Sequence, residues 1–312
     1  MVTSLCESPR AINSIYFYDE IGSELFERLC EEETYYLFRT EKSILAKHAQ
    51  SISDVTGPVS LIELGSGNAE KTTLLVGAYV KAHGQTTYAA IDINHSILKR
   101  AAENILSDAS DLGFLGIVGT YQTGLLQTKK LTGRKLLVSL GSTIGNLYDG
   151  ELNNLLLSTS SALSVGDYFL VGVDLDKETG IMEAAYNNQT AILTNFSALQ
   201  HVNQRFKGNF DLFRFRYMAF YNQSMSRMES YVQAVQEQTV NLRKLNFSFH
   251  LAKGEMIRTE IMRKFTLSAL NEIFVAYGFR PVQHWTDPEN RCAVSLFQLS
   301  DEPTKVDSER PV

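Results

Sequence analysis

The segment that most constrains the fold reads LIELGSGNAEKTTLL, from Leu61 to Leu75. An apolar run typical of a buried strand leads into a turn that contains Gly65 and Gly67, and the residues after the turn favour a helix. Such a strand–turn–helix unit places backbone N–H groups at the carboxyl end of a strand, where many α/β proteins bind nucleotides. The segment therefore predicts an α/β domain with a pocket for a nucleotide-like molecule.

Short β-rich runs alternate with helical runs between about residues 56 and 176, which is the rhythm of parallel βαβ units. We expect strands at residues 60–64, 87–93, 115–118, 135–140 and 168–173, and helices at residues 69–81, 95–106 and 149–163. The expected strands are apolar on both faces, as a sheet covered by helices on both sides requires.

The pattern changes after Asp174. Residues 181–206 favour one or two helices, and residues 214–265 alternate polar and apolar positions as an antiparallel sheet does. The chain then returns to the first pattern, with a helix at 267–277, a strand near 281–285, the turn TDPEN and a closing strand at 293–299. The tight turn makes the last strand antiparallel to its neighbour.

A largely parallel sheet that ends in an antiparallel hairpin is similar to the sheet of class I S-adenosylmethionine methyltransferases. Nicotinamide-binding Rossmann domains usually add a sixth parallel strand instead. We expect a methyltransferase domain of residues 40–176 and 265–312, and a second, α+β substrate-binding domain of residues 1–39 and 177–264. The final segment, SDEPTKVDSERPV, is expected to be a disordered tail.

The chemistry of the glycine turn favours a ligand without phosphates. Gly65 and Gly67 permit a sharp turn and a close approach of the backbone to a ligand. The place of the third glycine in the dinucleotide pattern is taken by Glu70, whose charge opposes a pyrophosphate, and no Walker lysine follows at the required spacing. Asp92 ends the next strand, where a carboxylate can accept hydrogen bonds from ribose hydroxyls; the alternative is a solvated strand end or a helix cap.

The composition argues for a small-molecule partner. With 29 basic and 35 acidic residues, the net charge of −6 provides no basic surface for nucleic acid or an anionic membrane. We expect a cytoplasmic protein, because neither a signal peptide nor an apolar run long enough to span a bilayer is evident. The cysteines fit neither a disulfide framework nor a zinc site, and the histidines lack metal-binding spacing, so no metal is expected. The oligomeric state is left open.

Several segments, in their order along the chain, resemble the histidine-specific S-adenosylmethionine methyltransferase family. They are YDEIGSELFERLCEEETYYLFRTEKSIL, ELGSGNAEKT, GSTIGN, VGVDLDK followed by EAAYNN, and GEMIRTEIMRKF. The resemblance extends from about Ile15 to Leu299. It implies α-N-methylation of a free L-amino acid by S-adenosylmethionine, with L-histidine converted to its trimethylated betaine as in ergothioneine biosynthesis. Another amino acid, such as tryptophan or tyrosine, is the alternative substrate.

The resemblance also implies where the cofactor binds. Lys71 would reach the methionine carboxylate and Asp92 the ribose, while Thr120 replaces an aspartate that contacts the adenine amine in much of the family. The expected cofactor residues are Gly65, Gly67, Lys71, Asp92, Thr120, Tyr121 and Gly141.

For the amino-acid substrate, the resemblance implies a carboxylate held by Asn146 and Tyr186. Tyr18 and either Tyr35 or Tyr36 would enclose the amine. Tyr18 is the expected catalytic residue, holding a water that takes the proton which the amine must lose before it can be methylated. Tyrosine faces also suit a substrate whose ammonium becomes methylated, because aromatic rings attract such cations.

The side chain of the substrate is where this chain departs from the family. Glu260 matches the glutamate that binds the imidazole, but Met262 stands where the family has serine and Ser230 where it has methionine. Ser230 could supply a hydroxyl from the other side of the pocket, or the two changes could reshape it for another side chain. Without the resemblance, Met262 would be read as core packing and Glu260 as a surface strand residue.

Two other classes of function remain open from the sequence. One is a nicotinamide-dependent oxidoreductase, which the missing third glycine and the terminal hairpin disfavour. The other is a non-catalytic protein that binds S-adenosylmethionine, which the retention of Asn146 and Tyr186 disfavours.

Overall fold

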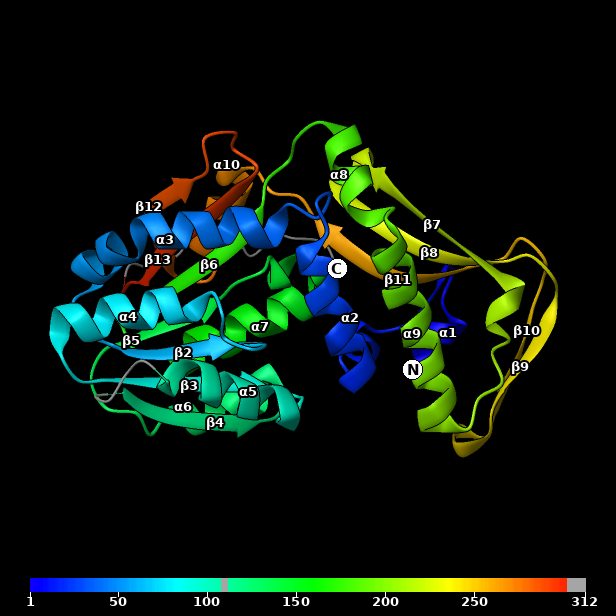
Figure 1. Cartoon of the computed structure of the whole chain (residues 1–312), viewed down its shortest axis with the longest axis horizontal. Coiled ribbons are helices and arrows are strands. Elements are labelled where there is room, and N and C mark those ends of the chain that lie inside the picture. Colours follow the sequence, from blue (N-terminus) through cyan, green and yellow to red (C-terminus); the bar gives the residue numbers. More distant parts are fainter. Residues whose placement is uncertain (108–111, 302–312) are drawn as a thin grey trace. The chain divides into compact units, whose positions relative to one another are not determined.

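The computed structural model describes residues 1–107 and 112–301 and divides the chain into two compact units (Figure 1). The parallel-sheet unit contains Leu37–Asp176 and the chain from Phe265 onward, and the antiparallel-sheet unit contains Met1–Tyr36 and Lys177–Lys264. The first division falls where helix α3 (Leu37–Thr56) begins, a few residues before the boundary expected at residue 40. From residue 302 on, the segment expected to be a disordered tail lies outside the described residues.

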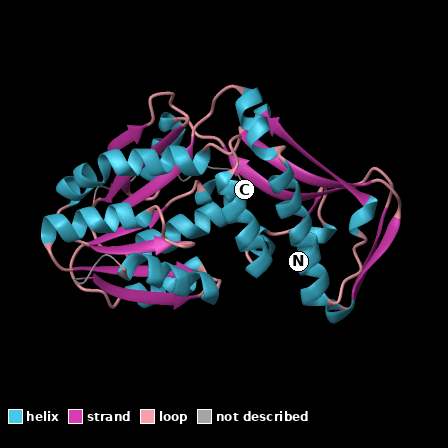
Figure 2. Ribbon diagram, in the orientation of Figure 1, coloured by secondary structure: helices cyan, strands magenta, loops and turns pink. Residues whose placement is uncertain are grey.

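The parallel-sheet unit is built on a mixed sheet of strand order β12-β13-β6-β5-β2-β3-β4. Figure 2 draws strands in magenta and helices in cyan. The parallel strands of this sheet are β2 (Ser60–Leu64), β3 (Thr86–Asp92), β4 (Leu112–Val118), β5 (Lys135–Ser139) and β6 (Tyr168–Asp174). Strand β13 (Cys292–Leu299) is antiparallel to both β6 and β12 (Phe279–Thr286). This is the class I methyltransferase arrangement, so the predicted fold, including the terminal hairpin, is confirmed.

Helices cover this sheet because its central strands are apolar on both faces. Every residue of β5 and β6 is buried, which requires cover on both sides. The remaining helices of the unit are α4 (Thr72–His83), α5 (His95–Leu106), α6 (Tyr121–Thr128), α7 (Asp149–Ala162) and α10 (Leu267–Val275). Helix α10 returns the chain to the sheet by stacking Phe274 on Phe297 of β13, with ring centroids 4.0 Å apart.

Two differences from the sequence-based expectation have local causes. Helix α4 begins at Thr72 instead of residue 69, because Ala69 has a left-handed backbone with φ of 58° that belongs to the preceding turn. Helix α6 was not predicted, because it is short and carries Gly124 in its middle.

The antiparallel-sheet unit has a sheet of order β1-β11-β8-β7 and a separate β9–β10 hairpin. The strands are β1 (Arg10–Ala11), β7 (Phe215–Asn222), β8 (Arg227–Ala234), β9 (Gln238–Leu242), β10 (Phe247–Leu251) and β11 (Met256–Arg263). The antiparallel pairing expected over residues 214–265 is present, and the helical run expected at 181–206 forms two helices. The helices are α1 (Val2–Cys6), α2 (Glu20–Glu31), α8 (Thr179–Tyr186) and α9 (Gln189–Phe206), with the 3-10 helix η1 (Ser14–Phe17).

Side-chain chemistry explains the break between α8 and α9. The side chain of Asn188 accepts a hydrogen bond of 2.8 Å from the backbone N–H of Ala191, and so caps the start of α9. Leu199 and Val202 of α9 then pack against Val232 of β8 and Ile257 of β11 in one apolar cluster. Helix α9 is therefore held against the sheet at a fixed position, which fixes the side chains on its first turns.

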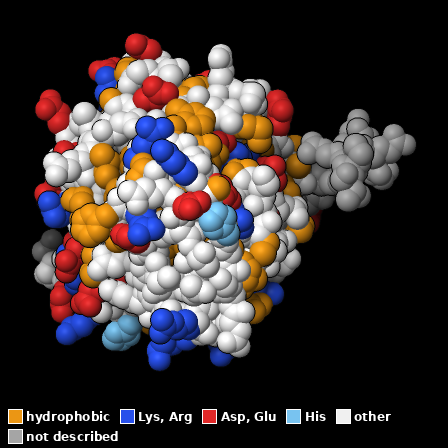
Figure 3. All heavy atoms as spheres, turned by 90° about the vertical axis from the view of Figure 1, so that its right-hand side faces the viewer, with side chains coloured by type: hydrophobic (Ala, Val, Ile, Leu, Met, Phe, Trp, Pro, Cys, Tyr) orange, Lys and Arg blue, Asp and Glu red, His pale blue; other side chains and the backbone are white. Residues whose placement is uncertain are grey.

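Acidic and basic side chains are interspersed on the face shown in Figure 3. Within residues 1–107 and 112–301, no helix has the length and apolar character needed to cross a bilayer.

Candidate functional site

The glycine turn after β2 has the geometry that its sequence predicts. Gly65 and Gly67 have φ of 70° and 52°, in the left-handed region that favours glycine. A Cβ on Gly65 would lie 3.1 Å from the hydroxyl of Tyr121, so a side chain there would crowd the neighbouring loop. The N–H of Gly65 donates to the carbonyl of Ile91 at 2.8 Å, which ties the turn to the end of β3.

Asp92 lies beside this turn at the end of β3. One carboxylate oxygen accepts the N–H of Gly67 at 3.2 Å and the other accepts the N–H of Asn94 at 2.9 Å. Burial raises the pKa of Asp92, and these backbone donors oppose that rise. Asp92 does not cap a helix, because Asn94 is the N-cap of α5, and each carboxylate oxygen of Asp92 has a second lone pair for a ligand hydroxyl.

Glu63 of β2 is a second buried carboxyl group under the turn. Its oxygens accept the Thr72 hydroxyl at 2.8 Å, and it also accepts the hydroxyl of Tyr88. Burial raises the pKa of Glu63 to about 7, against hydrogen bonds from Tyr88 and Thr72 that lower it. These contacts connect β2, β3 and the start of α4 beneath the glycine turn.

Lys71 follows the turn at the start of α4 and pairs with Glu41 of helix α3. Glu41 also accepts the N–H of Gly141, at 2.8 and 2.9 Å from its two oxygens. Glu41 was missed as a site residue, although a charged side chain between Leu37 and Ile44 on the buried face of a helix was a usable signal. Its partners lie far away in the sequence and could not be predicted.

The expected cofactor residues therefore collect at the carboxyl ends of β2, β3, β4 and β5. Thr120 is exposed and caps α6, with its hydroxyl 3.4 Å from the N–H of Thr123. Tyr121 follows it, and burial together with the charge of Asp92 raises the pKa of its hydroxyl. Asn146 is buried at the end of the 3-10 helix η2 (Thr143–Asn146), in the turn that follows β5.

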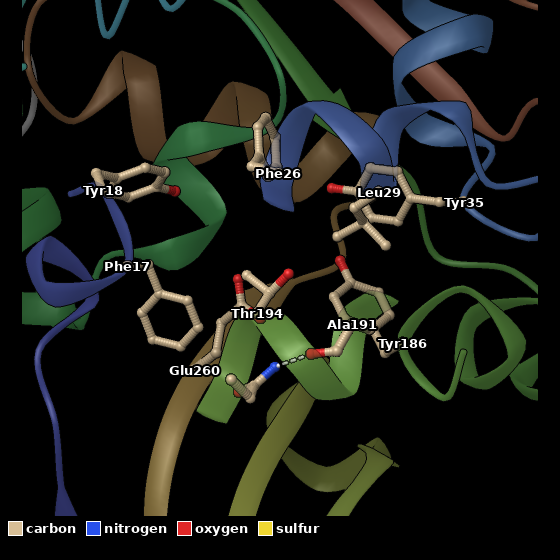
Figure 4. A pocket seen from close by; sticks show the side chains of 10 residues that line it. Phe17, Tyr18, Phe26, Leu29, Tyr35, Tyr186, Ala191, Thr194 and Glu260 are labelled. Carbon is tan, nitrogen blue, oxygen red and sulfur yellow. Dashed lines mark hydrogen bonds between the residues drawn. The ribbon is translucent and has the colours of Figure 1, made fainter. Parts of the chain in front are cut away.

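The antiparallel-sheet unit contains a pocket with aromatic walls (Figure 4). Its lining residues are Phe17, Tyr18, Phe26, Leu29, Tyr35, Tyr186, Ala191, Thr194, Asn195 and Glu260. The expected substrate residues Tyr18, Tyr35, Tyr186 and Glu260 are among them. The others were missed, because Phe17, Phe26 and the polar pair Thr194 and Asn195 carry no motif of their own.

The aromatic side chains form a continuous series along the pocket. Tyr18 meets Phe26 edge to face with centroids 6.4 Å apart, Phe26 meets Tyr35 at 6.4 Å, and Tyr35 meets Tyr186 at 6.2 Å. Edge-to-face contacts hold aromatic rings at defined angles. The series can therefore present ring faces to a bound cation.

The structure distinguishes the two neighbouring tyrosines that the sequence left as alternatives. Tyr35 lines the pocket, whereas the hydroxyl of Tyr36 accepts a hydrogen bond of 2.8 Å from the ammonium of Lys177. Tyr36 is not one of the residues that line this pocket.

Lys264 adds a buried positive charge beside the pocket. Its side-chain nitrogen donates to the Tyr186 hydroxyl at 3.1 Å and lies 4.7 Å from the centre of that ring. Because an ammonium group only donates, the Tyr186 oxygen accepts, and its own proton points away from Lys264. The pair thus presents donor character and positive charge, which suits a carboxylate.

Ser230 and Met262 lie next to Glu260 on the sheet. Ser230 is the partner of Glu260 across the β8–β11 ladder, and Met262 follows two positions later on β11. Tyr217 donates to the carbonyl of Tyr186 at 2.9 Å, so the Ser230 hydroxyl, 3.0 Å away, donates to Tyr217. Ser230 and Met262 are buried and do not line this pocket.

Within residues 1–107 and 112–301, no three His, Cys, Asp or Glu side chains are grouped so that they could hold a metal ion.

Comparison with known proteins gives a family match over most of the chain. A family model described as histidine-specific, S-adenosylmethionine-dependent methyltransferase matches residues 1–299. The histidine N-alpha-methyltransferase of Mycolicibacterium smegmatis is 31% identical over 294 residues, covering 94% of this chain and 91% of that protein. The enzyme of the same name from Mycobacterium tuberculosis is 29% identical, covering 94% and 92%. A 4-dimethylallyltryptophan N-methyltransferase of Aspergillus fumigatus is 24% identical, covering 96% and 92%.

Glu63 should make the stability of the protein depend on pH. Its pKa is about 7 when folded against an ordinary 4.5, so the folded state binds the proton more tightly. The contribution of Glu63 to the free energy of unfolding is therefore fully present below pH 4.5. It is lost as the pH rises through 7, by up to about 3 kcal/mol. Urea unfolding at about pH 5 and about pH 8 measures this loss. Between the two pH values, the free energy of unfolding should fall less for Glu63→Gln than for the unsubstituted protein. An equal fall in both proteins would contradict this account of Glu63.

Proposed function

Because the chain belongs to the histidine-specific, S-adenosylmethionine-dependent methyltransferase family, we propose that its substrate is free L-histidine and its product Nα-trimethylhistidine. The protein is an N-methyltransferase that uses S-adenosylmethionine. The α-amine accepts the methyl group, and the product is a betaine that fits the ergothioneine pathway. The observation that carries the proposal is a single pocket that combines aromatic walls with the Glu260 carboxylate.

The residues of the parallel-sheet unit fit the cofactor. The cofactor supplies a methyl group that its sulfonium has already activated. We assign Asp92 to the ribose hydroxyls, Lys71 to the methionine carboxylate, and the Gly65–Gly67 turn and Gly141 to close backbone contacts. Thr120 and Tyr121 are assigned to the adenine end. The positive φ at Gly65 and the crowding that a Cβ would cause there support a turn made for close approach.

Glu260 is assigned to the imidazole of the substrate. A carboxylate accepts an imidazole N–H in a charge-assisted hydrogen bond, which is stronger than a bond between neutral groups. With its proton committed to Tyr217, Ser230 keeps acceptor capacity on its oxygen, next to Glu260 across the ladder. Because Ser230 does not line the pocket, it is Glu260 that favours a side chain which donates hydrogen bonds.

Tyr186 and Lys264 are assigned to the α-carboxylate. The Lys264 ammonium holds the Tyr186 oxygen as an acceptor, so the tyrosine proton is oriented for donation elsewhere. The part of Asn146 in binding the same carboxylate is a prediction from the family resemblance alone.

The amine must be neutral to accept a methyl group, although a free amino acid carries an ammonium at neutral pH. We assign Tyr18 to hold the water that removes one proton before each of the three transfers. The remaining rate enhancement comes from positioning, which can contribute about 7 to 11 kcal/mol. Ring faces of Tyr18, Tyr35 and Tyr186 stay compatible with the ammonium as methyl groups are added, at about 0.5 to 2 kcal/mol per face.

An aromatic amino acid, tryptophan or tyrosine, is the second candidate substrate. Met262 replaces the serine expected beside Glu260, which removes one polar partner of an imidazole. A buried donor or acceptor left without a partner costs about 1 to 3 kcal/mol. A relative that is 24% identical carries a tryptophan derivative in its name.

Asp92→Ala should weaken cofactor binding far more than amino-acid binding. Each hydrogen bond lost to this charged group is expected to cost about 1.5 to 3 kcal/mol at most. Calorimetry with S-adenosylhomocysteine and, separately, with histidine measures both effects, and Asp54→Ala, which removes an exposed carboxylate of helix α3, is the control. Unchanged cofactor affinity in Asp92→Ala would place the ribose elsewhere.

The substrate assignment predicts that histidine gains methyl groups when all twenty amino acids compete in one mixture with S-adenosylmethionine. Mass spectrometry should show gains of one, two and three methyl groups on histidine alone. Methylation of tryptophan or tyrosine with histidine unchanged would mean that Ser230 and Met262 have redirected the pocket. The double variant Ser230→Met and Met262→Ser should then shift activity toward histidine. If no amino acid is methylated although the cofactor binds, the proposed function is wrong.

A further inference from the structure

We propose that Glu41 is a positioning residue for the amino-acid end of the cofactor, acting through the ammonium of Lys71. The inference deepens the proposed function, because it depends on Lys71 facing the methionine carboxylate. It concerns residues of the parallel-sheet unit only.

Glu41 is a charged side chain that the fold has enclosed. The side chain is 4% exposed, on the face of α3 that also buries Ile44 and Leu45. Removing a carboxylate from water is costly unless opposite charge and hydrogen bonds compensate it. The identity of its partners therefore indicates what the buried charge does.

Both partners of Glu41 come from loops to which the cofactor has been assigned. The Glu41 carboxylate accepts the N–H of Gly141, in the turn after β5, and pairs with the ammonium of Lys71, in the turn after β2. One carboxylate thus joins two neighbouring loops at the carboxyl edge of the sheet to helix α3.

The surrounding backbone is adapted to this arrangement. A Cβ on Gly172 of β6 would lie 1.7 Å from the Glu41 carboxylate, so a side chain at this position would displace the carboxylate. A Cβ on Gly141 would lie 3.4 Å from the Lys71 ammonium, and the φ of 74° at Gly141 also favours glycine. The space for the ion pair is therefore built from strands and turns of the same unit.

Glu41 itself does not touch the ligand in this scheme. Its carboxylate is enclosed and already engaged by Gly141 and Lys71, whereas the Lys71 ammonium has three N–H donors and uses one on Glu41. A held ammonium loses less rotamer freedom when a ligand carboxylate binds. Glu41 therefore prepares Lys71 for the methionine carboxylate and keeps the Gly141 turn beside it.

A neighbouring ion pair offers a matched control. Lys42 pairs with Glu70 at 2.6 Å, so it connects the same helix to the same turn. The side chains of Lys42 and Glu70 are 43% and 44% exposed. Ion pairs with such exposure contribute little to stability. If holding α3 to the turn were sufficient, breaking either pair would have the same effect.

The test compares two ligands on the unsubstituted protein and on Glu41→Gln, Glu41→Ala and Glu70→Gln. S-adenosylhomocysteine has the amino-acid end, and 5′-methylthioadenosine shares the adenosine and the sulfur but lacks that end. Glu41→Ala should lose about tenfold or more in affinity for S-adenosylhomocysteine, since the Lys71 ammonium loses the carboxylate that holds it in place. Affinity for 5′-methylthioadenosine should stay unchanged. Glu41→Gln, which keeps the shape and acceptor oxygen, should lose less, and Glu70→Gln should bind both ligands normally.

The outcomes separate this inference from the proposed function. Equal weakening of both ligands, or an unchanged affinity for S-adenosylhomocysteine in folded Glu41→Ala, would overturn the role of Glu41. Thermal unfolding of each variant establishes that it is folded. If Glu41→Ala does not fold, the same comparison is made with Glu41→Gln. If the unsubstituted protein binds neither ligand, the proposed function and this inference both fail.

Discussion

A charge that leaves water must find compensation inside the protein, and this constraint determines much of the structure. Glu41 meets it with Lys71 and a backbone N–H, and Glu63 meets it with hydroxyls of Thr72 and Tyr88. In the antiparallel-sheet unit, Glu229 meets it with Arg227, Tyr231 and Asn222. Each carboxylate joins segments that are separate along the chain or adjacent across a ladder. Glu41 and Glu63 therefore hold the turns after β5 and β2 in place, and their partners cannot be removed without cost.

The same logic connects the fold to the proposed chemistry. Parallel strands bring their carboxyl ends to one edge, so the turn after β2, Asp92 and the turn after β5 become neighbours although they are far apart in sequence. In the other unit, helix α9 and strand β11 bring Thr194, Asn195 and Glu260 to the aromatic series around Tyr18. The proposed function accordingly assigns the nucleoside to the first unit and the amine to the aromatic pocket of the second.

The features that the sequence could predict are those that depend on local patterns and motifs. The strand at Ser60–Leu64, the glycine turn and Asp92 are readable because period, turn chemistry and spacing act over a few residues. Tyr35 could not be separated from Tyr36, because only the fold decides which of two adjacent rings faces a pocket and which meets Lys177. The partners of Glu41 and the donor role of Ser230 were hidden for the same reason. They depend on contacts between segments that the chain brings together only when folded.

The central claim is that the α-nitrogen of the amino acid accepts the methyl group. It is tested most directly by NMR of the product formed from L-histidine labelled with ¹⁵N only at the α-amine and S-adenosylmethionine labelled with ¹³C in its methyl group. The account predicts that the transferred methyl carbons show one-bond coupling to the labelled nitrogen and become equivalent once trimethylation is complete. Labelled methyl signals without coupling to that nitrogen would place the methyl group on the imidazole or the carboxylate and would contradict the account.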